Sequence, residues 1–429
     1  MIVEQLVPAR GFVELDSVFS GLDDGAGIAE PFADGTIAFF SEVSRRLGSN
    51  PATAPMPDLR ALAFWMRRSH LLELERQFRD SNAPGSLRLP RGVVFHIPPA
   101  NVDTIFMYSW LLAALTGNQN VVRLPSLRDE ATLILCATVN EVLATREFGR
   151  LVPGVAVVGY GHDAAITAAL SARADVRVVW GGDATVAKIR EIPIRPRAVE
   201  LTFADRYSLA AIGARAYLEA DQTKRAQLVE DFVSDTFPFD QGACSSPQLV
   251  VWCGSADDAD RAADAFFTAV AVAAGRRGYA VDVGTAVAQT LAAANLAADH
   301  AVRRCQRYGR ELMVVEIAGP VDVARNHVGG GYLLSVRLGA LAELAPFLTR
   351  SDQTMTQFGF GEAELLDFAT RAAGSGGIDR IIAFGQALTF DRFWDGYDLL
   401  NAFTRTVTVT ADPGLRPLAR QPSDRERVG

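Results

Sequence analysis

The chain has 429 residues, a formal net charge of −8, 49% hydrophobic residues and 21% charged residues. That length allows two or three domains of ordinary globular composition, and the negative charge gives nucleic-acid binding no electrostatic support. No apolar run reaches the length of a membrane span, and the N-terminus lacks the basic and apolar regions of a signal peptide. Four cysteines without a CxxC pair and five isolated histidines predict a reduced, cytoplasmic protein without a metal site.

The first 90 residues carry the weakest pattern. Residues 1–58 are weakly periodic and rich in glycine, aspartate and proline, and a single helix is expected at 58–78. We therefore assign 1–90 to an N-terminal extension with helices that docks on the main body.

From residue 91 onward, short apolar runs alternate with helical patterns. This alternation predicts βαβ units, and the uninterrupted apolar strands indicate a parallel sheet covered on both faces. Residues 91–205 are therefore predicted to form a Rossmann-type cofactor-binding domain, with its ligand at the carboxyl ends of the strands. The expected strands are 92–97, 120–124, 155–158 and 176–180, and the expected helices are 104–115, 130–143, 164–170 and 184–189.

A second α/β region, residues 206–375, is predicted to be the catalytic domain. Its expected helices are 214–235, 257–274, 285–308 and 362–373, and its expected strands are 248–253, 312–317 and 333–336. Residues 376–410 are expected to return to the main body and to supply an oligomerisation segment. The alternating strand at 404–410 would leave an unpaired edge in a monomer, so we expect a homo-oligomer, dimer or tetramer. The Pro- and Arg-rich residues 411–429 are expected to be disordered.

One cysteine lies in an unusual turn between a helix pattern and an apolar strand. Cys244 has only small neighbours, at residues 242, 243, 245 and 246, and prolines at 238 and 247 stiffen both approaches. A thiol in a rigid, uncluttered turn is suited to covalent catalysis at a carbonyl. The alternative is a buried structural cysteine, and the turn by itself slightly favours that alternative.

Five separated motifs occupy residues 92–101, 115–126, 178–183, 198–201 and 237–248. In their order and spacing they resemble those of the aldehyde dehydrogenase superfamily. Seven stretches give a closer resemblance, at 161–163, 180–183, 196–201, 205–208, 244–248, 377–380 and 393–398. In these the chain resembles one branch, the acyl-CoA reductase (LuxC) family, which includes the fatty-acid reductase of bacterial bioluminescence. The resemblance implies an α/β fold of aldehyde-dehydrogenase type, with a Rossmann-type cofactor domain, an α/β catalytic domain and a short oligomerisation strand.

The resemblance also implies three catalytic residues. Cys244 matches the nucleophile of the family, which makes the catalytic interpretation the better one. Asn101 matches the asparagine whose amide forms half of an oxyanion hole, the other half being the backbone N–H of Cys244. Glu200 matches the general base of the superfamily, although Leu201-Thr-Phe follows it where Leu-Gly-Gly is usual. In a reductase, Glu200 is expected to move protons and not to activate water.

The cofactor contacts are assigned by the same resemblance. Where the superfamily usually reads Lys-Pro-Ser-Glu, this chain has Leu124-Pro-Ser-Leu127, flanked by arginines. Loss of the ribose-binding carboxylate and a nearby guanidinium favour a 2′-phosphate, so we expect NADPH to be preferred over NADH. The assigned cofactor residues are Arg123, Pro125, Ser126, Arg128, Gly161, Gly181, Gly182 and Glu316.

These expectations combine into one activity with two alternatives. The resemblance implies reduction of an acyl thioester, carried by CoA or an acyl-carrier protein, to an aldehyde through an S-acyl-cysteine. An acyl-activating or acyl-carrier protein is the expected kind of partner. The alternatives are an oxidative NAD(P)-dependent aldehyde dehydrogenase and a catalytically silent subunit that keeps the fold.

Overall fold

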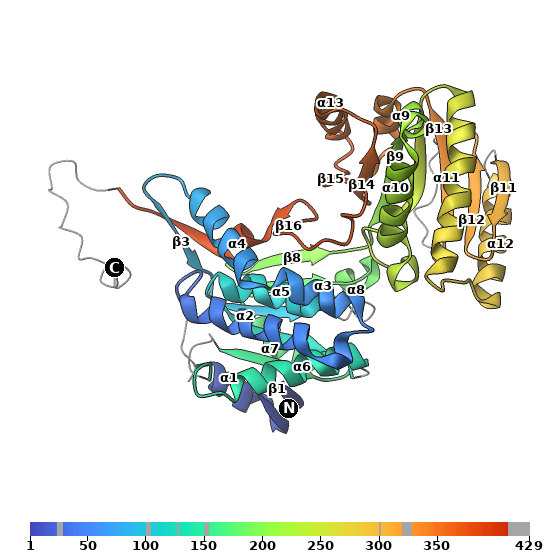
Figure 1. Ribbon diagram of the computed structural model, residues 1–429. Helices are drawn as coiled ribbons and strands as arrows, with labels where there is room; N and C mark the ends of the chain where they lie inside the picture. The colour runs from blue at the N-terminus through green and yellow to red at the C-terminus, as the bar shows by residue number, and fades with distance from the viewer. Residues whose placement is uncertain are drawn as a thin grey trace.

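Two seven-stranded sheets organise the computed structural model, which describes residues 1–23, 29–99, 104–126, 128–149, 154–299, 302–319 and 328–410. Figure 1 shows them as two bodies, the blue and green N-terminal one and the green, yellow and orange one beside it. The C-terminal segment leaves the second body and returns along the first (Figure 1). This return brings residues from both ends of the sequence to the junction of the two bodies.

The first sheet has the strand order β2-β1-β6-β5-β4-β7-β8. The five neighbouring strands β6, β5, β4, β7 and β8 run parallel to one another, and β1 pairs with β6 in the antiparallel direction. The strands are β1 (Ile2–Val7), β2 (Ala9–Glu14), β4 (Val93–Ile97), β5 (Gln119–Leu124), β6 (Val155–Gly159), β7 (Val176–Trp180) and β8 (Val199–Phe203). The parallel strands confirm the expected Rossmann-type sheet, and β1 and β2 are additions that the weak periodicity of the first residues concealed.

Helices cover both faces of the first sheet, as the uninterrupted apolar strands require. The helices on one face are α2 (Asp34–Ser49), α3 (Pro57–Trp65), α4 (Arg68–Asp80), α5 (Ile105–Leu115) and α6 (Glu130–Leu143). The helices on the other face are α1 (Leu15–Asp23), α7 (Ala164–Arg173) and α8 (Asp183–Arg190). Every side chain of α5 is buried, which places this helix at the centre of the domain.

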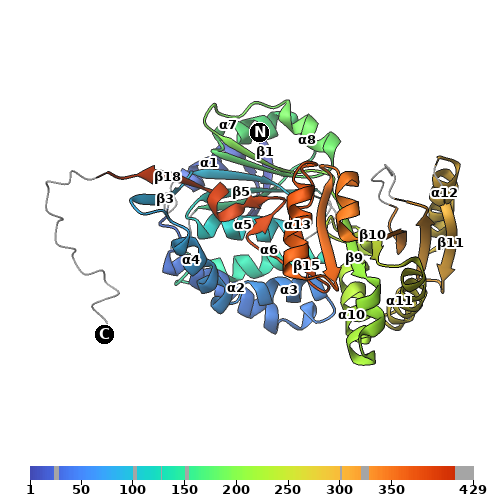
Figure 2. The ribbon, with the colours of Figure 1, turned by 90° about the horizontal axis from the view of Figure 1, so that it is seen from above.

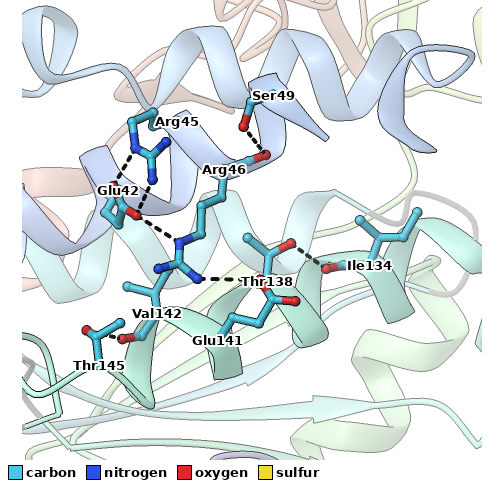
Figure 3. Close-up of polar contacts among 9 residues, drawn as sticks. All are labelled: Glu42, Arg45, Arg46, Ser49, Ile134, Thr138, Glu141, Val142 and Thr145. Atoms are coloured by element: carbon cyan, nitrogen blue, oxygen red, sulfur yellow. Dashed lines mark hydrogen bonds and ion pairs between the residues drawn. The ribbon is translucent and has the colours of Figure 1, made fainter. Parts of the chain in front are cut away.

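Ion pairs tie α2 to α6 at the surface of the first body. Glu42 accepts hydrogen bonds from Arg45 and Arg46, and these two cations lower the pKa of Glu42 to about 2 (Figure 3). Arg46 also reaches Glu141 of α6 at 3.5 Å. Figure 3 shows Arg46 between the two helices, with Glu42 on one side and Glu141 on the other.

The second sheet has the order β11-β12-β13-β10-β9-β14-β15. Its strands are parallel except for the edge strand β11. The strands are β9 (Tyr207–Gly213), β10 (Pro247–Cys253), β11 (Val302–Tyr308), β12 (Leu312–Ile317), β13 (Tyr332–Leu338), β14 (Asp352–Phe358) and β15 (Arg380–Ala383). One face packs on α9 (Ala214–Glu219), α10 (Gln222–Thr236) and α11 (Ala256–Arg276). The other packs on α12 (Val283–Asp299), η3 (Leu341–Phe347) and α13 (Glu362–Ala372).

Three of the expected helices are corrected. The helix expected at 214–235 is the two helices α9 and α10, because Ala220 and Asp221 between them are extended. The helix expected at 58–78 is two helices, because Arg67 is extended and its side chain donates to the carbonyl of Phe64 at 2.8 Å. The helix expected at 285–308 ends at Asp299, and β11 follows as an antiparallel edge strand. Cys305, expected on a helix surface, therefore lies exposed on this strand.

The C-terminal strand has a partner within the chain. β18 (Thr404–Thr408) pairs antiparallel with β3 (Ser86–Pro90) in a two-stranded sheet. In both views this ribbon projects from the first body, away from the second (Figures 1 and 2). The hairpin strands β16 (Phe393–Trp394) and β17 (Tyr397–Asp398) and the short helix α14 (Leu399–Ala402) precede it.

Candidate active site

The two bodies enclose a cavity of about 970 Å³. The first body contributes the carboxyl ends of β4, β7 and β8, and the second contributes the cysteine turn that precedes β10. The C-terminal return closes one side with Phe390, Trp394 and Asp395. Much of the wall is aromatic, since Trp180 and Phe203 stack with their ring centroids 3.7 Å apart and Phe390 stacks on Tyr108 at 5.1 Å.

The turn before Cys244 has an unusual backbone. Phe239, Asp240 and Gln241 all have left-handed φ angles, of 55°, 54° and 64°. A Cβ on Gly242 would lie 2.6 Å from the carbonyl oxygen of Phe239, so only glycine fits at this position, two residues before the cysteine. Left-handed non-glycine residues cost free energy and persist only where their surroundings hold them, often at functional sites.

The side chain of Gln241 holds this turn in its left-handed conformation. Its side chain is fully buried, and its amide nitrogen donates to the carbonyl oxygens of Pro247 at 2.9 Å and Tyr332 at 3.1 Å. Its amide oxygen accepts the backbone N–H of Gly331 at 3.0 Å. The side chain thereby fastens the turn to the amino ends of β10 and β13, and it fixes the position of Cys244.

Cys244 opens into the cavity with a half-buried side chain, and the hydroxyl of Ser208 donates to its carbonyl oxygen at 2.7 Å. Burial, and to a smaller extent the charge of Asp395, raises the pKa of the thiol to about 12. A hydrogen bond from Gln353 and the charges of Arg206 and Arg380 oppose this rise. Cys244 is therefore a protonated thiol at neutral pH, and a nucleophilic role requires a proton acceptor.

Glu200, the expected general base, does not line this cavity. Its carboxylate pairs with the buried Arg177, whose Nε lies 2.7 Å away, and with Arg190 at 2.9 Å. Successive residues of a strand face opposite ways, and Phe203 of the same strand β8 lines the cavity. The structure thus places Glu200 on the opposite face of the first sheet, which corrects the expected geometry. Asn101 lies outside the described residues, so its assignment stays a prediction.

Several of the expected cofactor residues gather where β5 and β6 end. Arg123 extends over the ring of Tyr160 at 5.4 Å and donates to its carbonyl oxygen at 3.4 Å. A Cβ on Gly161 would lie 4.0 Å from the hydroxyl of Ser126, so Pro125, Ser126 and Gly161 belong to adjacent loops. Arg123, two backbone loops and a serine hydroxyl form a surface that suits an anionic ligand.

Arg128 is less available than expected. Its guanidinium pairs with Glu4 of β1 at 2.7 Å and donates to the carbonyl oxygen of Pro125 at 3.0 Å. The side chain is 11% exposed. Leu127, where the superfamily often has a glutamate, lies outside the described residues. Of the two arginines, Arg123 therefore has more donors left for a phosphate.

Gly181 and Gly182 lie in the cavity wall, between β7 and α8, as a pyrophosphate loop would. However, Asp205 already occupies the start of α8, because its carboxylate accepts the backbone N–H of Asp183 at 2.9 Å. Asp183 returns the contact by accepting the N–H of Asp205 at 3.2 Å. A phosphate at this helix end would have to displace the Asp205 carboxylate.

Glu316 is the expected cofactor residue that the structure separates most clearly from Cys244. It lies on β12 level with Ser335 of β13, which is itself level with Val250 of β10. Cys244 precedes the amino end of β10, so Glu316 lies farther along the parallel sheet. The carboxylate is paired there with Arg337 at 2.5 Å.

Sequence reasoning assigned no role to three residues near the nucleophile. Arg206, Gln353 and Asp395 meet beside Cys244, and they come from the segment before β9, from β14 and from the β16–β17 turn. Arg206 and Asp395 stand in stretches 205–208 and 393–398, which the family resemblance had singled out. Those stretches were the available signal, but only the fold joins them. Among the described residues, no cluster of His, Cys, Asp or Glu side chains could hold a metal ion.

The fold of the chain is that of the aldehyde dehydrogenases. The structure is similar to aldehyde dehydrogenase 21 of Physcomitrella patens in complex with the reaction product succinate. The TM-score is 0.64 at 12% identity, over 91% of this chain and 89% of that one. It is also similar to proline utilization A (PutA) of Bdellovibrio bacteriovorus inactivated by N-propargylglycine, with a TM-score of 0.62 at 13% identity, over 95% and 47% of the two chains. The chain thus spans about half the length of the PutA proteins that it matches, 47% of this one and 46% of another.

The family match is more specific than the fold. The model of the acyl-CoA reductase (LuxC) family matches residues 68–277, from the start of α4 to just past α11, and this segment contains Cys244. The resemblance carried by the sequence motifs is therefore confirmed over these residues. No curated protein was found to match the sequence. None of the described helices is long and apolar enough to cross a membrane.

Proposed function

We propose that the protein reduces an acyl thioester to an aldehyde through an S-acyl intermediate on Cys244, with NADPH as reductant. The carrying observation is the position of Cys244, in a turn fixed by Gln241 and open to the cavity between the two sheets. The acyl donor is a CoA ester or an acyl-carrier protein. Thioester exchange suits this site, because the attacking and the leaving groups are both thiols.

The cavity supports an apolar acyl group. Trp180, Phe203, Phe390 and Trp394 form a continuous aromatic wall near the thiol, and Leu388 extends it. Burial of an acyl chain against this wall would gain about 0.8 kcal/mol for each methylene. The same wall keeps water away from the acyl-enzyme, which a reductase must not hydrolyse.

NADPH is proposed from the surface at the ends of β5 and β6. Arg123, Ser126 and the backbone at Gly161 would hold the adenosine end, with Arg123 on the 2′-phosphate. The bound cofactor would supply the hydride that turns the acyl group into an aldehyde. A free nucleophilic thiol also favours a reducing compartment, and we propose a cytoplasmic location.

The oxidative alternative has less support. Water activation by Glu200 would require its carboxylate in the cavity, whereas Arg177 and Arg190 hold it on the other face of the sheet. Product analysis separates the reactions, since a reductase forms aldehyde from thioester and reduced cofactor. A silent subunit would bind NADPH and turn over neither thioester nor aldehyde.

Intact mass spectrometry without cofactor tests the covalent step. Wild-type protein incubated with a panel of acyl thioesters should gain the mass of one acyl group for an accepted donor. Cys244→Ala should gain none, and Cys305→Ala, which removes an exposed cysteine, should behave as wild type. Equal acylation of wild type and Cys244→Ala would show that the nucleophile is elsewhere.

A further inference from the structure

A buried carboxylate on the C-terminal return lines the same cavity as Cys244. Asp395 occupies the tight turn between β16 and β17 with a left-handed φ of 49°, and its side chain is 6% exposed. Gln353 of β14 donates its side-chain N–H to Asp395 Oδ1, and Arg206 Nε lies 3.6 Å from the same oxygen. Both partners belong to the second body, so the turn is held against the cysteine by contacts between distant parts of the chain.

Gln353 acts on both the carboxylate and the thiol. Its side chain is fully buried on β14, it donates to Asp395, and it lowers the pKa of the Cys244 thiol. Its amide oxygen is buried and has no hydrogen-bond partner within the part of the chain that the structure describes. The amide therefore keeps capacity for a further polar group beside the sulfur.

The surroundings of Asp395 bring the pKa of its carboxyl close to neutral pH. Burial is the largest cause, and it raises this pKa to about 6, with a smaller contribution from the charge of Asp379. Arg206, Gln353 and Arg380 favour the ionised form and limit the rise. Cys244 and Tyr108 are further titratable groups beside it. A base with a pKa just below neutrality is ionised at pH 7, and it can also hold a proton at modest cost.

The other described carboxylates of the cavity lack this coupling. Asp183 and Asp205 accept each other's backbone N–H groups, and Asp58 lies in the first turn of α3. Asp395 is the carboxylate that acts electrostatically on the thiol. Glu200 is held on the far side of the first sheet.

We propose that Asp395 is the base that takes the proton of Cys244 during acylation and returns it to the departing thiolate. The inference rests on the proposed acyl transfer. The S–H bond of Cys244 breaks as its proton passes to Asp395, and the sulfur electron pair forms the bond to the acyl carbon. The bond from that carbon to the donor sulfur then breaks, and the donor leaves as a thiol with the proton from Asp395. Gln353 is a positioning residue in this step, because it orients the carboxylate toward the sulfur.

Single-turnover acylation across pH tests the proposal in the full-length protein. The wild-type rate, measured by mass spectrometry with an accepted acyl-CoA and no cofactor, should fall below about pH 6, because protonated Asp395 cannot accept a proton. Asp395→Asn should lose this dependence and acylate about 10²–10⁴ times more slowly. Asparagine tolerates a left-handed backbone, so the turn should survive the change.

Alkylation of Cys244 by iodoacetamide, quantified on its peptide, separates chemistry from folding. Removing the charge of Asp395 lowers the thiol pKa, so Asp395→Asn should alkylate as fast as wild type or faster. Gln353→Leu removes a donor that favours ionised Asp395, so the pH limb should move to higher pH. Asp58→Asn, a carboxylate change in the same cavity, should keep the limb where wild type has it.

Four outcomes overturn the proposal. Two concern acylation by Asp395→Asn: a rate within threefold of wild type, or a rate that still falls below about pH 6. The third is an alkylation rate in that variant that falls as much as its acylation rate, and the fourth is a pH dependence of acylation in Gln353→Leu that equals that of wild type. If wild type itself acylates, these results leave the thioester reductase function standing. A wild-type protein that accepts no acyl group from any donor overturns both.

Discussion

Arg123 lies near the carboxyl end of β5 and Arg128 follows that strand, but their contacts give the two arginines different roles. Arg123 makes one long hydrogen bond to a carbonyl and lies over the Tyr160 ring, whereas Arg128 is occupied by Glu4 and Pro125. We expect Arg123→Ala to weaken NADPH binding about tenfold, or about 1.4 kcal/mol, and to leave NADH binding nearly unchanged. Dissociation constants for both cofactors, measured by fluorescence titration, provide the check.

Arg128→Ala is the matched comparison for that experiment. It breaks the ion pair to β1, so its effect should fall on the stability of the first sheet and equally on both cofactors. A wild-type protein indifferent to the 2′-phosphate, or an Arg123→Ala variant with unchanged NADPH affinity, would contradict the assignment.

Single residues differ in how far their place could be predicted from the sequence. Cys244 was predictable, because small neighbours and prolines surround it within one short stretch. Asp395 was not, because its role depends on Arg206 and Gln353, which stand far away in the chain and meet it only through the fold. Glu200 was expected from its motif to be the base of the site. Its carboxylate instead pairs with the buried Arg177, on the face of the first sheet opposite the cavity.

At the scale of elements, the cysteine turn depends on one side chain. Gln241→Ala would leave the carbonyls of Pro247 and Tyr332 and the N–H of Gly331 without their partners. Each unsatisfied buried group costs about 1–3 kcal/mol, and non-additive losses should lower the free energy of unfolding by about 2–4 kcal/mol. Acylation of Cys244 should also slow more than tenfold, because the left-handed turn can relax. Urea unfolding and mass spectrometry of the acyl-enzyme measure the two effects.

A buried glutamine outside the cavity provides the control for that change. Gln119 of β5 is buried in the first body and donates to the carbonyl of Leu22 at 2.6 Å. Gln119→Ala should therefore lose stability while Cys244 acylates at the wild-type rate. If the two variants slow acylation equally, Gln241 has no special part in the turn.

The elements that the sequence predicted best are the parallel strands. Continuous apolar runs such as 92–97 and 176–180 stand out because both faces of the first sheet are covered, and β4 and β7 lie there. The failures came where tertiary pairing decides the structure. Residues 302–308 are a strand because they pair with β12, and β1 is a strand because it pairs with β6. Local periodicity carries no signal for either pairing.

At the scale of the whole molecule, the cavity is a product of the chain's route. The return from the second body places Phe390, Trp394 and Asp395 against residues of the first body and of the cysteine turn. Tyr108 of the fully buried helix α5 donates to the carbonyl of Asp391 at 2.5 Å, which fastens the return to the first body. The return therefore completes the active-site wall and also carries the last strand to its place beside β3.

The ribbon of β3 and β18 is the feature that most directly concerns assembly. Its strands pair with each other, so the outer backbone edges remain available, and it exposes Leu87 and Val409. Open strand edges are templates for pairing with another chain, and we predict a dimer or tetramer built partly through this ribbon.

Removing residues 404–429 should deprive β3 of its partner and lower the molecular mass measured by light scattering. Removing only 411–429 should leave that mass at the full assembly, less the deleted residues. A 404–429 deletion that keeps the native size would contradict a role for the ribbon, and a monomeric full-length chain would contradict assembly altogether.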